Sequence, residues 1–137
     1  MAATLTSKTF QFELVSPEKI LVSEQVSMVT IPGEEGDFGV LADHAPVLSS
    51  VRPGVVTVQT PDGAEKKIFV SGGFADVSGA ICALLAEEAV NVNDLDKAAL
   101  EKQLHDLKDD LGFAKGDAVK SAIVQKQIAL VQAKLLV

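Results

Sequence analysis

The chain has 137 residues, a mean hydropathy of +0.28 and 47% hydrophobic residues, which excludes an intrinsically disordered protein. Its formal net charge of −7 disfavours nucleic acid and anionic lipid as primary partners, because phosphate binding depends on basic side chains. The longest apolar runs, such as 81–86, fall short of the roughly 20 residues of a membrane-spanning helix, so a soluble or at most peripheral protein is expected.

The negative charge is concentrated in the N-terminal part of the sequence. Residues 1–90 carry five Lys or Arg against twelve Asp or Glu, whereas 91–137 carry seven of each. Residues 1–12 show neither a secretory signal nor an Arg-rich transit peptide, and the single Cys82 forbids an internal disulfide. These features together predict a cytoplasmic protein.

Alternating apolar and polar residues predict short β-strands at the start of the sequence. Residues 9–15 alternate with Phe and Leu on one face, which is typical of a half-buried strand. Two further β-rich runs, 19–22 and 25–31, are separated by Ser23-Glu24. A fourth short run covers 47–51.

The segment 32–46 is expected to be an ordered, acidic loop. Two prolines bracket three glycines, four acids and one of the two histidines, a composition too irregular for a helix and too Gly-rich for a plain strand. Phe38–Leu41 is its only candidate pairing segment. No Lys or Arg lies between Gly33 and Ala45, so the segment suits a basic partner surface.

Two β-hairpins are predicted next. One has Asp62-Gly63 in its turn, between strands at 55–60 and 65–71, and the other turns at Ser78-Gly79 before a strand at 80–86. Short strands with turn signals about every ten residues indicate an antiparallel β-sandwich or barrel. No crossover helix fits before residue 90.

Near residue 91 the apolar period becomes helical. Four leucines at spacings of four, three and four predict a first helix at about 94–111: Leu100, Leu104, Leu107 and Leu111. Asn93 is its expected N-cap, and Gly112 is the expected C-terminal stop.

A second helix is predicted from the cap Asp117 to about Leu135. Its apolar face would consist of Ile123, Val124, Ile128, Val131 and Leu135. The short connection 112–116 predicts an antiparallel hairpin, in which the acid-rich first helix faces Lys120, Lys126 and Lys134. We therefore expect two domains, a β-sandwich at 1–90 and an α-helical hairpin at 91–137.

Residues able to bind a metal or to catalyse a reaction are scarce. The potential ligands Cys82, His44 and His105 lie in three different regions, so no metal site is expected. Cys82 is expected to be buried in a strand, and His105 to lie at the helix surface or in the hairpin seam. No Walker-type or dinucleotide-binding glycine loop is present, so no cofactor is expected.

One enzymatic interpretation remains open at this point. Asp37 or Asp43 could orient His44 as a general base, which would make the protein a small hydrolase. No nucleophile or oxyanion motif accompanies these residues. Solvated acids in a docking loop are the simpler interpretation.

Several motifs along nearly the whole sequence resemble those of one family, the epsilon subunit of F-type ATP synthases, called delta in mitochondria. In order they are Leu14-Val15-Ser16-Pro17-Glu18, then Pro32-Gly33 through Gly36-Asp37-Phe38-Gly39-Val40-Leu41 to His44-Ala45-Pro46, then Pro53-Gly54-Val55-Val56, then Val70-Ser71-Gly72-Gly73-Phe74, and Leu84-Leu85-Ala86-Glu87 with Leu95-Asp96. Each motif is short, but their order and spacing are specific.

The resemblance implies a fold and a mechanical role. It implies a ten-stranded β-sandwich with a C-terminal two-helix hairpin, forming a non-catalytic rotor subunit at the foot of the central stalk. Such a subunit binds the gamma subunit and the ring of membrane c subunits, and passes rotation to the alpha/beta catalytic head in ATP synthesis. By this resemblance Glu35, Gly36, Asp37 and His44 contact the c-ring, at the cytoplasmic face of a bacterial inner membrane, and membrane association is through partners only.

Two departures from the family pattern refine this expectation. Ala42-Asp43 stands where many bacterial members have Pro-Gly, which is closer to the alphaproteobacterial and mitochondrial type. Ala99 stands where ATP-binding members carry an arginine, so nucleotide binding is not expected. The hairpin could still weakly regulate ATP hydrolysis through Lys120, Lys126 and Lys134, and an ATP-gated inhibitory sensor is the alternative interpretation.

Overall fold

The structure is a computed structural model that describes residues 8–137. Residues 1–7 lie outside the described residues. They belong to the segment 1–12, for which neither a secretory signal nor a transit peptide was expected. The protein divides into two compact units between Val92 and Asn93. Within the described residues, no helix is long and apolar enough to cross a membrane.

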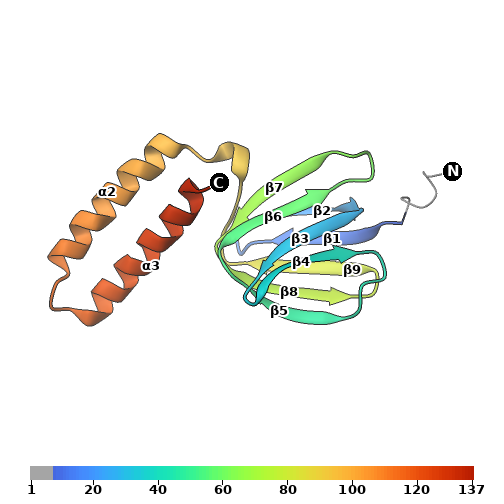
Figure 1. The fold of residues 1–137 in the computed structure, drawn as a ribbon, viewed down its shortest axis with the longest axis horizontal. Helices are drawn as coiled ribbons and strands as arrows, with labels where there is room; N and C mark the ends of the chain where they lie inside the picture. The colour runs from blue at the N-terminus through green and yellow to red at the C-terminus, as the bar shows by residue number, and fades with distance from the viewer. Residues whose placement is uncertain (1–7) are drawn as a thin grey trace. The chain divides into compact units, whose positions relative to one another are not determined.

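The first unit consists of ten strands (Figure 1). Their bounds are β1 Phe10–Val15, β2 Ile20–Val26, β3 Met28–Gly33, β4 Gly36–Leu41, β5 Val47–Val51, β6 Gly54–Gln59, β7 Glu65–Val70, β8 Gly73–Ser78, β9 Ile81–Ala86 and β10 Ala89–Asn91. The hydrogen-bonded order is β10-β7-β6-β3-β5-β8-β9-β1-β2, and β4 pairs with β3 outside this path. The predicted fold class is confirmed.

One strand pair departs from the antiparallel pattern. β1 runs parallel to β9, with Phe12 opposite Cys82 and Leu14 opposite Leu84. A parallel pair needs a long connection, which the intervening seven strands provide. Short-range turn signals cannot predict such a pairing, because they specify hairpins between neighbouring strands only.

Side chains that alternate along the strands form the core of this unit. Phe10, Phe12 and Leu14 of β1 are buried, while Gln11 and Glu13 lie toward solvent, as their alternation predicts. The most deeply buried large side chains come from several strands: Phe12, Phe69, Leu14, Ile31, Leu84, Val26 and Val29. This interdigitated core fixes the strands that carry the candidate site.

Two sequence-based strand assignments near the N-terminus are wrong. β2 continues through Ser23 and Glu24, because both pair with β1, Ser23 opposite Glu13 and Glu24 opposite Phe12. The break falls instead at Ser27, whose N–H and hydroxyl both donate to the carbonyl oxygen of Gln59, each at 2.9 Å. Two polar residues inside a paired strand were therefore mistaken for a break. Glu24 shares the face of Val22 and Val26, and its carboxylate pairs with Lys66 at 2.7 Å.

The segment predicted to be an acidic loop is largely a β-hairpin. β3 and β4 pair in continuous antiparallel register from Met28–Leu41 to Gly33–Gly36. Only Glu34 and Glu35 lie outside the strands at its tip. The glycines were read as loop residues, whereas here they belong to paired strands.

The two later hairpins are confirmed. β6 pairs with β7 around the turn at 60–64, and β8 pairs with β9 around Gly79-Ala80. Gly73 opens β8, where a Cβ atom would lie 1.9 Å from the carbonyl oxygen of Leu85. β10 is an additional three-residue strand, which pairs with β7.

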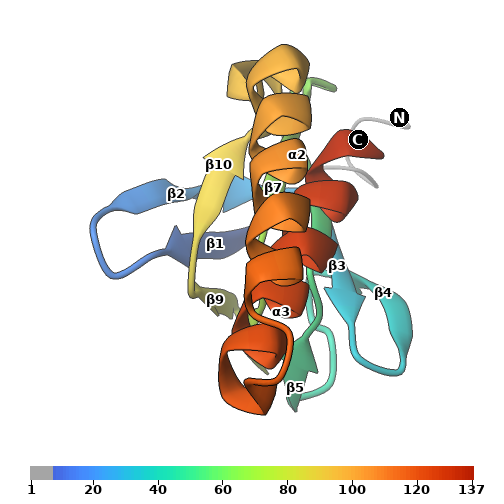
Figure 2. The same ribbon diagram turned by 90° about the vertical axis from the view of Figure 1, so that its left-hand side faces the viewer.

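The second unit contains a short 3-10 turn, η1 (Val92–Asp94), and two helices, α2 (Lys97–Phe113) and α3 (Ala118–Leu135). Figure 1 shows α2 and α3 side by side, and in the turned view of Figure 2 α3 lies behind α2, which agrees with the predicted hairpin. Buried Leu100 and Leu107 of α2 and Val131 of α3 form its centre. Leu95, Leu104, Val124, Ile128 and Leu135 pack around them.

Several details of this hairpin differ from the predictions. The N-cap of α2 is Asp96, not Asn93, because its carboxylate accepts the N–H groups of Ala98 and Ala99 at 3.0 and 3.3 Å. The helix continues through Gly112 to Phe113, and the positive φ of +90° occurs at Gly116 instead. Asp117 is the N-cap of α3, as predicted.

The predicted helix faces are correct only in part. Ile123 is 55% exposed, so it does not belong to the face of α3 that packs on α2. Lys120 and Lys126 make no ion pair within residues 8–137, so they do not pair with the acids of α2. The hairpin is therefore held by its leucine and valine seam and its caps.

Candidate functional site

The tip of the β3–β4 hairpin is built on two glycines. Gly33 and Gly36 face each other across the tip, and Gly36 has a φ of +131° that favours glycine. A Cβ atom at Gly33 would lie 2.8 Å from the carbonyl oxygen of Gly36 and 2.9 Å from the Phe38 ring. The ring of Phe38 thus covers Gly33, and this close contact presents Glu34 and Glu35 at the end of the hairpin.

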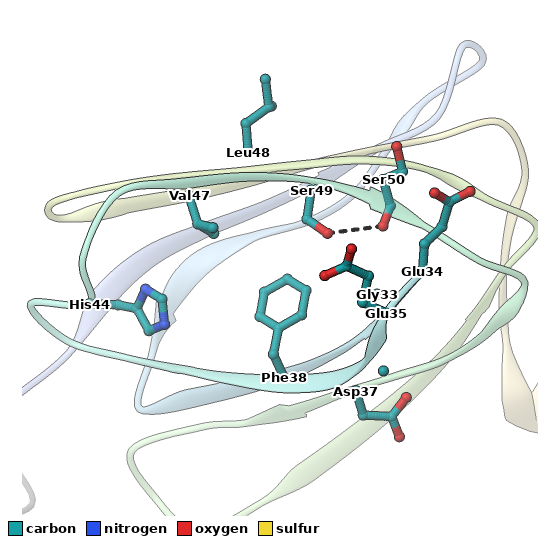
Figure 3. Close-up of a pocket in the computed structure, with 11 residues that line it drawn as sticks. Gly33, Glu34, Glu35, Asp37, Phe38, His44, Val47, Leu48, Ser49 and Ser50 are labelled. Atoms are coloured by element: carbon teal, nitrogen blue, oxygen red, sulfur yellow. Dashed lines mark hydrogen bonds between the residues drawn. The ribbon is translucent and has the colours of Figure 1, made fainter.

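An open cavity of about 540 Å³ lies between this hairpin and β5 (Figure 3). We call it the hairpin pocket. Phe38 and Val47 point into it from facing strands, with His44 toward one end and Glu34 toward the other. Its complete lining is Gly33, Glu34, Glu35, Gly36, Asp37, Phe38, His44, Val47, Leu48, Ser49 and Ser50, which includes no Lys or Arg.

The backbone also fixes the tip to β5. The N–H of Glu34 donates to the carbonyl oxygen of Ser50 at 3.0 Å, and Gly33 pairs with Val51. The side chains of Glu34 and Glu35 make no ion pair within residues 8–137. Two carboxylates without an ion-pair partner in the described residues therefore line a partly apolar cavity, an arrangement suited to a long basic side chain.

Arg52 joins the two strands of the hairpin. Its Nη2 lies 2.5 Å from a carboxylate oxygen of Asp37, and its Nη1 donates to the carbonyl oxygen of Gly33 at 2.6 Å. Its backbone N–H donates to the carbonyl oxygen of Pro32 at 2.9 Å. These contacts were not predicted from the sequence, although Arg52 is its only arginine and directly follows β5.

His44 lies in the turn that follows β4. Its N–H donates to the carbonyl oxygen of Leu41 at 3.2 Å, and its Nδ1 lies 2.6 Å from the carbonyl oxygen of Ala45. Asp43 pairs with Lys8 at 3.2 Å, and Asp37 pairs with Arg52. Neither carboxylate orients the imidazole, so the Asp–His base of a hydrolase is not formed.

The four residues predicted to contact a ring lie around one cavity. Glu35, Gly36, Asp37 and His44 all line the hairpin pocket. Asp37 points away from Phe38 and the pocket centre, toward the opposite face of its strand (Figure 3). Glu34, which the prediction omitted, joins the group, and its place at the tip of a two-residue turn could have been found from the Gly-Glu-Glu-Gly spacing.

The other residues singled out from the sequence lie away from this pocket. Cys82 is buried, and burial together with the nearby Asp76 raises the pKa of its thiol to about 12. Ala99 lies in the first turn of α2, where its N–H binds the Asp96 cap. Lys120 and Lys126 are exposed and Lys134 is half-buried, all on α3.

His105 lies on the exposed surface of α2, which is one of the two positions predicted for it. Its Nδ1 is 3.3 Å from a carboxylate oxygen of Asp109, one turn later. With Asp106 these residues make the one group within residues 8–137 that could hold a metal ion, and all three are exposed. Exposed side chains on a single helix are a poor metal site, because nothing fixes their geometry.

A row of apolar side chains crosses the outer surface of the sheet. Ile20 of β2 is opposite Val15 of β1, and Val15 is opposite Leu85 of β9. Leu85 is in turn opposite Phe74 of β8. Ile20, Leu85 and Phe74 are 63%, 58% and 57% exposed, so this apolar row is available for a partner.

Comparison with known proteins adds two family matches. Residues 9–92 match the family described as ATP synthase, Delta/Epsilon chain, beta-sandwich domain, and residues 96–137 match the C-terminal domain of the ATP synthase epsilon chain. An ATP synthase epsilon chain of Mesorhizobium japonicum is 51% identical over 119 residues, covering 87% of this protein and 88% of the relative. One of Rhodospirillum centenum is 47% identical over 130 residues, covering 91% and 88%.

Solved structures resemble the same fold. A subunit in the Euglena gracilis mitochondrial ATP synthase, a structure of OSCP, F1 and c-ring, has a TM-score of 0.76 and 27% identity, covering 93% of this protein and 79% of that subunit. A subunit of the Tetrahymena thermophila mitochondrial ATP synthase, central stalk and c-ring, has a TM-score of 0.60 and 14% identity, covering 93% and 97%. The second likeness concerns the fold alone.

Proposed function

The chain belongs to the delta/epsilon family of ATP synthase subunits, and from this membership we infer that it is a non-catalytic subunit of the central stalk. It couples rotation of the membrane c-ring to the gamma subunit and the catalytic head in proton-driven ATP synthesis. The observation that carries this conclusion is the family match over both units, together with 51% identity to an established epsilon chain. The hydrolase and ATP-sensor interpretations are not favoured.

The hairpin pocket is the surface proposed to meet the c-ring, with Glu35, Gly36, Asp37 and His44 as contacts and Glu34 added. Three features of the pocket support this assignment. Its two tip carboxylates make no ion pair within the described residues, its lining contains no Lys or Arg, and its Phe38 and Val47 side chains offer apolar contact for the stem of a basic side chain. A backbone bond from the N–H of Glu34 to the carbonyl oxygen of Ser50 also ties the tip to β5, which restricts where the charges can lie.

The apolar row is proposed as a contact surface for the gamma subunit. Large exposed apolar side chains in register across four strands are typical of a protein–protein interface and costly in a free protein. A stalk subunit needs two separate contacts, one to the ring and one to the shaft. The hairpin pocket and the apolar row would provide them with different chemistry, one charged and one apolar.

The C-terminal hairpin is proposed to regulate ATP hydrolysis weakly, through Lys120, Lys126 and Lys134 on α3. Lys120 and Lys126 are exposed and have no acidic partner within residues 8–137, so they remain available to an acidic segment of the catalytic head. Ala99 in place of the family arginine supports regulation without bound ATP. The site of action is proposed to be the cytoplasmic face of a bacterial inner membrane, with peripheral attachment through partners.

The docking assignment is tested by neutralising the two tip acids. The double variant Glu34→Gln/Glu35→Gln removes both unpaired charges and retains side-chain size. We expect about tenfold weaker association of the ring with the stalk and head, because two charge contacts of about 0.7 kcal/mol each are lost. The measurement is the amount of c-ring that co-purifies with the head at increasing salt.

A matched variant controls for the change in net charge. Glu87→Gln/Glu101→Gln also removes two exposed carboxylates, but neither residue lines the hairpin pocket. This control should retain the ring as the unmodified protein does. Equal retention by both double variants would rule out the hairpin pocket as the ring contact.

A further inference from the structure

We propose that Arg52 is a positioning residue for docking to the ring, and that Asp37, named above among the ring contacts, contributes by anchoring Arg52 and not by touching the ring itself. This inference rests on the proposed ring contact at the hairpin pocket. The guanidinium of Arg52 lies between two strands of the hairpin, binding the Asp37 carboxylate of β4 and the Gly33 carbonyl of β3. One planar group thus connects both sides of the tip to the end of β5.

The geometry of this contact suits arginine alone. The two bonds, of 2.5 and 2.6 Å, come from the two terminal nitrogens of the same guanidinium, whose fork is rigid. A lysine ammonium is a single point charge, and it cannot span the two acceptors in the same fixed geometry. The backbone N–H of Arg52 adds a third bond, to Pro32 of β3.

The tip needs such a support because its backbone is intrinsically flexible. Glu34 and Glu35 lie between two glycines, which have the largest conformational freedom of all residues. Apart from the strand pairing and the bond from Glu34 to Ser50, the Arg52 contacts are what tie the base of this tip to the rest of the sandwich. Without the Arg52 contacts, Glu34 and Glu35 would sample positions from which they cannot contact the ring, which weakens binding.

Charge balance points to the same division of roles. Asp37 is paired with Arg52, whereas Glu34 and Glu35 make no ion pair in the part of the protein that the structure describes. The net attraction for a basic partner therefore comes from the two tip acids. The side chains of Arg52 and Asp37 are 44% and 60% exposed, so their ion pair adds little to global stability and acts mainly on the local geometry.

Four single variants of the full-length protein test this inference: Arg52→Ala, Arg52→Lys, Asp37→Ala and Asp37→Asn. We expect Arg52→Ala and Asp37→Ala to weaken ring association about fivefold. Asp37→Asn should retain more association than Asp37→Ala, because an asparagine oxygen still accepts from Arg52. Arg52→Lys should be intermediate, because the charge remains while the fork is lost.

A second measurement separates positioning from general destabilisation. Amide hydrogen exchange of the isolated subunit should become faster at residues 33–37 in the alanine variants, with the thermal midpoint nearly unchanged. Lys66→Ala is the matched control, because it removes the ion pair of Lys66 with Glu24 at 2.7 Å, which does not touch the hairpin. It should alter neither hairpin exchange nor ring association.

Three results would overturn the inference. One is full ring association in Arg52→Ala, and another is Asp37→Asn binding as weakly as Asp37→Ala, which would make the Asp37 charge a direct contact. The third is a thermal midpoint that falls in parallel with ring association. If any of these results occurs while Glu34→Gln/Glu35→Gln still weakens ring association, the docking assignment stands and only the proposed role of Arg52 is wrong.

Discussion

Asp43 has a backbone conformation that few side chains tolerate. Its φ is +65°, the only positive value at a non-glycine residue within residues 8–137, and the N–H of His44 donates to Leu41 across the turn. The turn consists of residues 41–44, and Asp43 is its third residue. A positive φ at the third residue alone is typical of a type II turn, which favours proline at the second position and glycine at the third. The Pro-Gly of many bacterial relatives fits these positions, where this protein has Ala42-Asp43.

Substitution of Asp43 tests this assignment of strain. Asp43→Gly removes the Cβ clash, whereas Asp43→Val places a β-branched side chain at positive φ. We expect the free energy of unfolding of the valine variant to be about 1–2 kcal/mol lower than that of the glycine variant. Denaturant unfolding of the two variants measures this difference. Both variants lose the ion pair of Asp43 with Lys8, so that loss cancels in the comparison. Equal midpoints would contradict the strained turn.

The members of the proposed docking site could be listed from the sequence, but their contacts could not. Glu35, Gly36, Asp37 and His44 belong to one motif, and all four line one cavity. Asp37 was paired with His44 because the two are close in sequence. The actual partner, Arg52, approaches Asp37 only because β3, β4 and the end of β5 lie together, an arrangement that depends on register across three strands.

At the scale of elements, strands with clear alternation and helices with regular leucine spacing were predictable. The β3–β4 hairpin was not, because its glycines resemble loop residues until the covering ring of Phe38 is known. The predicted start of α2 was three residues too early, because the sequence offers several possible caps. Asn93, Asp94 and Asp96 can all act as caps, and the choice of Asp96 follows from the 3-10 turn that uses the first two.

The apolar row allows a comparison within a single strand. Leu85→Ser removes a member of the row, while Ile81→Ser removes a similarly exposed side chain, 45% exposed, four residues earlier on β9. We expect Leu85→Ser to weaken binding to the gamma subunit about tenfold or more, because a large apolar contact is lost, and Ile81→Ser to have little effect. Titration with isolated gamma subunit measures both affinities, and equal losses would contradict the assignment of the row.

At the scale of the whole molecule, the two units divide the chemistry of the protein. The first carries the acidic surplus, the hairpin pocket and the apolar row, while the second carries balanced charge and three lysines on α3. The stalk function was predicted from the order and spacing of the family motifs, whereas the charge pattern alone indicated only a basic partner for the acidic segment. The apolar row could not be predicted, because it joins two hairpins far apart in the sequence, β1–β2 and β8–β9, through the parallel pairing of β1 with β9.

Coupling between proton movement and ATP hydrolysis tests the central claim most directly. ATP synthase reconstituted in vesicles is compared with and without this subunit, and ATP-driven proton pumping is measured per ATP hydrolysed. We predict that pumping per ATP is largely lost without the subunit and restored when the full-length protein is added, while hydrolysis continues throughout. A truncated form lacking 93–137 should restore pumping as well, with somewhat faster hydrolysis. Pumping per ATP that is the same with and without the full-length protein would contradict its role as the coupling subunit.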